Sequence, residues 1–84
     1  MAVDQDMFDA MSEDELVHYL QAVAEHRRDN LAIGERIGDL GIAEWVAEIW
    51  HVGGLAGRTV MFAGTGASRR DAMLALVRTV ASAR

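Results

Sequence analysis

Hydrophobic and polar positions follow a helical period over residues 12–31. Ser12 and Glu15 form a capping-box pattern, in which each side chain bonds to the backbone of the other residue. At 100° per residue, one arc collects the apolar side chains Leu16, Tyr19, Leu20, Val23, Ala24 and Leu31. Because Ile33 falls on the opposite side, the pattern predicts a helix that ends near Asn30 or Leu31.

A second helical pattern occupies the end of the chain. It begins after Ser68, which can cap its first turn, and Asp71 stands at the capping-box position. Its apolar stripe consists of Ala72, Met73, Leu76, Val77, Val80 and Ala83. The pattern predicts a helix whose apolar side packs on the rest of the molecule.

The stretch between these helices allows two interpretations. Residues 42–52 are amphipathic as a helix, but they are also rich in Trp, Val and Ile and precede two glycines, as a strand before a turn would be. Residues 58–63 are apolar, β-rich and short, and a strand there needs a partner. We therefore predict a hairpin of these two segments. Residues 32–41 hold three glycines and fit a turn, a brief helix or an edge strand.

The predicted fold is α+β: a helix, an antiparallel β-hairpin with room for a third strand, and a helix packed on one face of the sheet. The alternative is a small all-α bundle. Eighty-four residues, of which 51% are hydrophobic, suffice for one small domain, which we place at residues 12–84. Residues 1–11 are acidic and show no period, so they are expected to form a flexible arm.

Composition narrows the class of protein. The chain has no cysteine, which excludes disulfides and thiolate metal sites. It shows no signal-peptide pattern and no apolar run approaching the ~20 residues of a membrane span, so we expect a cytoplasmic protein without membrane contact. Lysine is absent and alanine and glycine are frequent, which is typical of a phage or high-GC bacterial genome.

Charge is divided unevenly along the chain. Residues 1–50 carry twelve acidic side chains and three arginines, whereas residues 51–84 carry one acid and five arginines. The first part therefore has a net charge of −9 and the second a net charge of +4, which together give the overall −5. This asymmetry indicates either a molecule with two differently charged faces or one with an acidic interaction surface.

Catalytic and metal-binding patterns are missing from the sequence. The histidines, His18, His26 and His51, are scattered without the spacing of metal ligands, and the two serines at helix starts act as caps. We therefore expect a protein that is not an enzyme and uses no metal or cofactor.

The segment from residue 64 to residue 72 carries the features of an anion site. Glycines let the backbone approach a ligand, a serine caps the following helix, and two arginines sit in its first turn, where the helix dipole favours negative charge. A plain strand–turn–helix connection would use the same glycines and serine cap. If the segment is instead a phosphate or anion site, that site consists of Gly64, Gly66, Ser68, Arg69 and Arg70.

The same segment, Gly64–Ala72, resembles the C-terminal signature of double-stranded RNA-binding domains, roughly Gly-x-Gly-x-Ser-basic-basic-x-Ala. The resemblance covers about residues 46–80. It implies an α-β-β-β-α fold with both helices on one face of an antiparallel sheet, and phosphate contacts by Arg69 and Arg70. Met73 stands where the family has a further basic residue.

Two functions follow from these observations. The first is a non-catalytic interaction module that binds a protein, in its sharper form a phage-type inhibitor that covers a nucleic-acid-binding surface of a host protein with carboxylates. Its candidate partner-binding residues are Asp14, Glu25, Glu44, Glu48, Trp45 and Trp50. The alternative is binding of double-stranded RNA through the arginine-led helix start, which we expect to be weak because two arginines neutralise few phosphates.

The tryptophans also predict self-association. Trp45 and Trp50 lie on opposite faces of a strand, so two helices on one face cannot bury both. Pairing of two copies across a two-fold axis would cover the exposed tryptophan in each. We therefore expect a homodimer.

Overall fold

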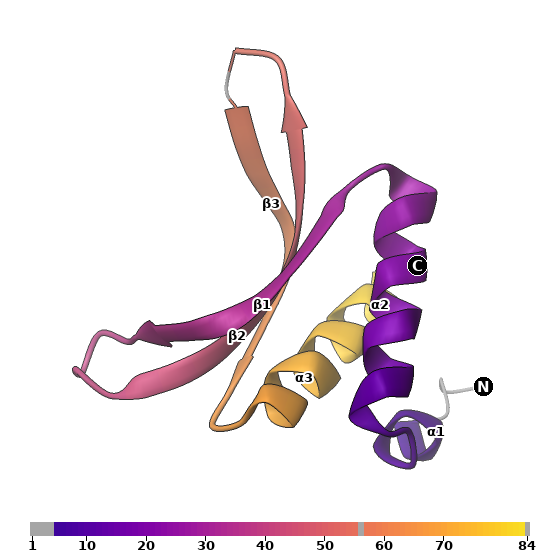
Figure 1. Ribbon diagram of the computed structural model, residues 1–84, viewed down its shortest axis with the longest axis vertical. Coiled ribbons are helices and arrows are strands. Elements are labelled where there is room, and N and C mark those ends of the chain that lie inside the picture. Colours follow the sequence, from indigo (N-terminus) through magenta and orange to yellow (C-terminus); the bar gives the residue numbers. More distant parts are fainter. Residues whose placement is uncertain (1–4, 56, 84) are drawn as a thin grey trace.

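The computed structural model describes residues 5–55 and 57–83, and its fold is α+β (Figure 1). The elements in chain order are α1 (Gln5–Asp9), α2 (Glu13–Arg27), β1 (Asn30–Ile37), β2 (Ala43–Gly53), β3 (Gly57–Gly66) and α3 (Arg69–Ser82). The three strands form one antiparallel sheet in the order β1-β2-β3. This confirms the α+β prediction, including the hairpin and its third strand, over the all-α alternative.

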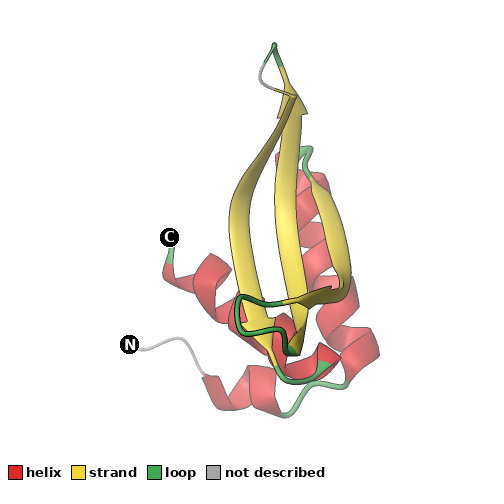
Figure 2. Cartoon of the chain, turned by 90° about the vertical axis from the view of Figure 1, so that its left-hand side faces the viewer, coloured by secondary structure: helices red, strands yellow, loops and turns green. Residues whose placement is uncertain are grey.

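Sheet and helices form two layers. Both long helices lie on one face of the sheet, so that Figure 2 shows the strands in front and the helices behind. Alternate residues of β2, which are Trp45, Ala47 and Ile49, point into the helical layer. The other face of the sheet carries no covering element in the described part of the chain, and we call it the open face.

The capping box of α2 is present as predicted. Ser12 Oγ accepts from the Glu15 amide at 3.2 Å, and Glu15 Oε1 accepts from the Ser12 amide at 2.8 Å. The helix ends earlier than Asn30, because Arg28 adopts a left-handed backbone with φ 60° and turns the chain toward the sheet. Leu31, which was expected on the helix, instead lies in β1 opposite Ile49.

The pairing of β2 with β3 contains an irregularity. Ile49 pairs with Phe62 and Trp50 with Val60, so Met61 is an extra residue on β3. Such a bulge bends the strand and increases its twist. It also leaves Val60 on the open face beside Trp50, while Phe62 packs against the core from the helical side.

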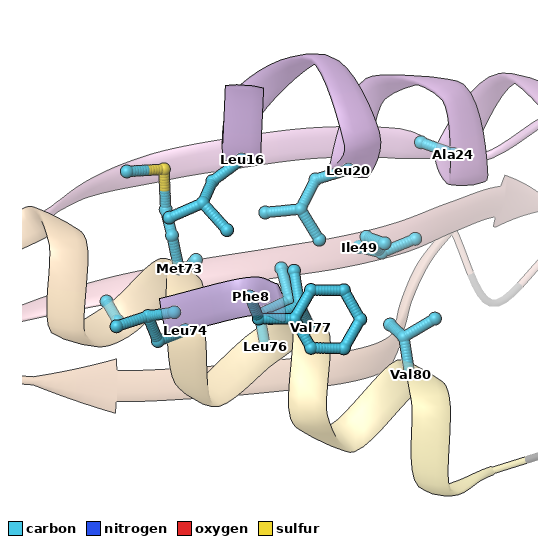
Figure 3. Close-up of a cluster of buried hydrophobic side chains, with 12 residues drawn as sticks. Phe8, Leu16, Leu20, Ala24, Ile49, Met73, Leu74, Leu76, Val77 and Val80 are labelled. Carbon is cyan, nitrogen blue, oxygen red and sulfur yellow. The ribbon is translucent and has the colours of Figure 1, made fainter. Parts of the chain in front are cut away.

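The core lies between the helices and β2. Its fully buried larger side chains are Leu16, Leu20, Ile49, Met73, Leu76 and Val77 (Figure 3). The side chains come from three elements that are distant in sequence. The packing therefore gathers these elements around α3, and the same core also includes Phe8 of α1.

The expected flexible arm at residues 1–11 contains structure that the sequence pattern did not show. Residues 5–9 form α1, and Phe8 is only 2% exposed. Its ring makes an edge-to-face contact with Tyr19, with ring centroids 5.4 Å apart. A single aromatic in so short a helix produces no period, which is why it went unpredicted; residues 1–4 lie outside the described part.

Candidate functional site

The two glycines of the predicted anion site lie against α3. A Cβ on Gly64 would lie 2.4 Å from the backbone nitrogen of Leu76 and 2.7 Å from the carbonyl oxygen of Ala72. A Cβ on Gly66 would lie 2.5 Å from Cβ of Asp71. The close approach that these glycines permit is therefore the approach of a helix to a strand.

The remaining residues of that site meet at the start of α3, where all three have partners within the chain. Ser68 Oγ accepts from the backbone of residue 71 at 3.1 Å, which makes Ser68 the helix cap. Arg69 Nη1 lies 2.8 Å from a carboxylate oxygen of Glu13.

Arg70 donates to the main chain where α1 ends. Its Nη1 lies 2.6 Å from the carbonyl oxygen of Met11, and its Nη2 lies 2.5 Å from that of Asp9. A third arginine, Arg78, pairs with the side chain of Asp9 at 2.7 Å. Together with Arg69, these contacts fasten α1 and the start of α2 to α3.

Three of the predicted partner-binding residues come together on the open face. Glu44, Glu48 and Trp50 occupy alternate positions of β2 on the side opposite the core. Around them lie Val46 on the same strand and Val60 on β3, which pairs with Trp50. The face is thus apolar at its centre and charged around it.

Both carboxylates of the open face form ion pairs. Glu44 Oε1 lies 3.0 Å from Nε of Arg36, and Glu48 Oε1 lies 2.8 Å from Nη2 of Arg58. The Arg58 guanidinium also lies over the Trp50 ring, 4.7 Å from its centroid. Within the described residues, the buried indole nitrogen of Trp50 has no hydrogen-bond partner.

The other three predicted residues lie elsewhere. Asp14 and Glu25 are exposed on α2, in the helical layer, and so cannot share a contact surface with the carboxylates of the open face. Trp45 packs against the core from the helix-facing side of β2. The structure therefore places Trp45 and Trp50 on opposite faces, as the strand interpretation predicted.

A cluster that the sequence did not indicate joins the end of α2 to β2. The Asp29 side chain is only 4% exposed, and its two oxygens bind His51 Nδ1 at 2.7 Å and Arg27 Nε at 3.2 Å. Arg27 also lies over the ring of Phe62, 5.0 Å from its centroid. Asp29 and His51 are 22 positions apart, and only the pairing of β1 with β2 brings them together.

A groove of about 340 Å³ runs between α2 and the end of α3, with β3 as its floor. Its apolar walls are formed by Tyr19, Val23, Phe62 and Val80, and Arg27 lies at its rim. No pattern in the sequence indicates this groove, because its lining residues belong to three separate elements.

Metal-binding clusters and membrane-spanning helices are absent from residues 5–55 and 57–83. No three His, Asp or Glu side chains there gather in a way that could hold a metal ion. None of the helices in this range has the length and apolar character that crossing a bilayer requires. Comparison with protein-family models, with curated proteins and with solved structures found no match to this chain.

Proposed function

We propose that this protein is a non-catalytic module that binds another protein through the open face of its sheet. The observation that carries the proposal is the apolar centre of that face. Trp50 lies there beside Val52 and Val60, which are 57% and 45% exposed. Aromatic side chains and arginine are enriched in protein–protein interfaces, and Arg58 stacked on Trp50 supplies both.

The composition of the open face departs from that of an ordinary solvated sheet. An antiparallel sheet with one face in water is typically polar on that face. Here the outward positions of β2 are Glu44, Val46, Glu48, Trp50 and Val52; Val46 is only 8% exposed, so Trp50 and Val52 supply the apolar surface that this strand leaves in water. Each exposed apolar Å² costs about 25 cal/mol relative to burial, which a docked partner would recover.

The charge balance of the open face supports binding of a partner to its apolar centre. The two carboxylates on this face are neutralised by Arg36 and Arg58, so the face is charge-balanced although the chain carries −5. For the same reason two copies can approach each other there. We therefore propose that, without its partner, the protein forms a homodimer across the open face.

The sharper form of the proposal concerns the acidic helix. Asp14 and Glu25 are exposed on α2 and have no arginine partner among the described residues. Because α2 lies on the helical side of the sheet, they would form a second contact area, separate from the open face, that meets a basic surface on a partner. A nucleic-acid-handling protein presents such a surface, and an inhibitor would act by occupying it.

The proposal is tested by affinity capture from a bacterial lysate with matched variants. Val60→Glu places a charge on the open face, whereas Leu40→Glu places it on an 87% exposed residue of the β1–β2 turn. We expect wild type and Leu40→Glu to retain the same protein and Val60→Glu to lose it. Equal capture by all three forms would refute the open face as the binding surface.

Double-stranded RNA binding is the second candidate. The order α2-β1-β2-β3-α3 is the α-β-β-β-α order that the resemblance to RNA-binding domains implies, and this observation favours it. Against it, Arg69 and Arg70 already have partners in the chain. We expect weak binding with a steep salt dependence.

Fluorescence anisotropy with an RNA duplex at ~150 mM salt measures this directly. Arg69→Ala is the informative variant, because Arg69 forms only an exposed ion pair while Arg70 holds α1 in place. Tight binding that this variant weakens would reverse the order of the two functions.

A further inference from the structure

The groove between α2 and α3 has the size and lining of a small-molecule site. Ligand sites in proteins begin at about 300 Å³ and are largely apolar with a few polar groups. This groove measures about 340 Å³, and its walls are the side chains of Tyr19, Val23, Phe62 and Val80. The groove is therefore large enough for a small ligand.

A positioned cation stands at one end of the groove. The Arg27 guanidinium lies against the Phe62 ring, and its Nε donates to Asp29 at 3.2 Å. The Asp29 side chain is only 4% exposed, and His51 contacts its other oxygen. The contacts with Phe62 and Asp29 orient the guanidinium, and its Nη1 and Nη2 have no hydrogen-bond partner among the described residues.

The charges around the groove select the ligand. The residues that line the groove include Arg27 but no carboxylate, because Asp29 pairs with the Nε edge of Arg27 and does not line the groove. A guanidinium with two free terminal nitrogens binds a carboxylate with two parallel hydrogen bonds. We infer that the groove binds a small aliphatic carboxylate of medium chain length, with its tail against Val23 and Val80 and its carboxylate on Arg27. This inference is independent of the proposed protein-binding function, because the groove lies on the other side of the sheet.

Three probes that differ only in the head group test the inference: octanoate, octanol and octylammonium, each below its micelle-forming concentration. Methyl NMR spectra of the full chain report where each probe binds. We expect octanoate to shift the methyl signals of Val23 and Val80, with at least about tenfold tighter binding than the other two. Equal affinity for octanol would overturn the carboxylate site, and shifts confined to Val52 and Val60 would overturn the groove.

Two variants separate the cation from the groove. Arg27→Gln should weaken octanoate binding by about tenfold or more, as expected for loss of a charge-assisted hydrogen bond. The matched control is Arg28→Gln, the neighbouring arginine that does not line the groove and should bind octanoate as wild type does. Val23→Trp should fill the groove and abolish binding with Arg27 intact.

The same methyl spectra show whether each variant is folded. A folded Val23→Trp or Arg27→Gln protein with unchanged octanoate affinity would overturn the inference. Val60→Glu, which tests the open face, should leave octanoate binding unchanged, so that failure of either proposal is visible separately.

Discussion

Replacing Gly64 by alanine should separate α3 from the sheet. The new methyl group would lie 2.4 Å from the Leu76 nitrogen and 2.7 Å from the Ala72 carbonyl oxygen. Both atoms belong to the backbone of a helix, so no change of side-chain rotamer can relieve the overlap. The helix as a whole must move by about 1 Å to restore ordinary contact.

That displacement would lower the free energy of unfolding considerably, because α3 lies at the centre of the core. A gap of 0.5–1 Å removes about a quarter to a half of the dispersion energy between facing atoms. Overpacking typically costs about 1–3 kcal/mol, and a backbone contact places this variant at about 3 kcal/mol or above. A domain of this length has a total stability of about 4–12 kcal/mol. The predicted loss in Tm is therefore about 12–24 °C.

Urea denaturation followed by tryptophan fluorescence and far-UV circular dichroism measures the free energy of unfolding. The matched control is Gly34→Ala on β1, where a Cβ has no heavy atom within 4 Å and φ is not positive. We expect this control to be neutral or slightly stabilising, by up to about 1 kcal/mol. If Gly64→Ala unfolds within about 0.5 kcal/mol of Gly34→Ala, the close-packing explanation of the glycine motif is wrong.

Three further predictions concern the helices and the open face. Phe8→Ala should cost about 3 kcal/mol by urea denaturation, since Phe8 is 2% exposed, and an unchanged stability would mean that α1 is not docked. The backbone and side-chain hydrogen bonds with Ser12 lower the pKa of Glu15, so wild type should be more stable than Glu15→Gln at neutral pH. This difference in stability should disappear as the pH falls through the lowered pKa, and a difference that persists in acid would contradict the explanation. Trp50→Phe should change the free energy of unfolding by no more than about 0.5 kcal/mol, because it removes a buried donor that has no partner. A loss of about 2 kcal/mol or more would show that the indole nitrogen makes a hydrogen bond.

Local signals predicted the elements well. The capping box at Ser12 and Glu15, the apolar stripe of the last helix and the glycines after β2 each act within a few residues, so the sequence displays them directly. The choice of strand over helix for residues 42–52 also held, because the neighbouring β-rich segment needed a partner.

Features that depend on distant residues could not be predicted. The bulge at Met61 arises from the register between β2 and β3. The pair of Asp29 with His51 arises from the pairing of β1 with β2. The left-handed Arg28 ended α2 early because the chain must turn there to enter the sheet. Each is a tertiary effect with no local pattern in the sequence.

For the candidate sites too, local features could be predicted from the sequence and features that depend on distant residues could not. The sequence predicted that Trp45 and Trp50 lie on opposite faces of a strand and that one of them is uncovered, since alternation along a strand is a local property. It did not reveal that Arg69 and Arg70 would find acceptors in residues 9–13, nearly 60 positions away. The groove between α2 and α3 also has no local pattern in the sequence, because the packing of the helices creates it.

The central claim, that the open face is a protein-binding surface, is tested most directly by light scattering at micromolar concentration without any partner. With its apolar centre intact, the chain of 9.2 kDa should form a dimer of about 18 kDa. Val60→Glu should return it to the monomer mass, and Leu40→Glu should leave the dimer unchanged. A wild-type mass of 9.2 kDa, or a dimer that Val60→Glu does not disturb, would contradict the account.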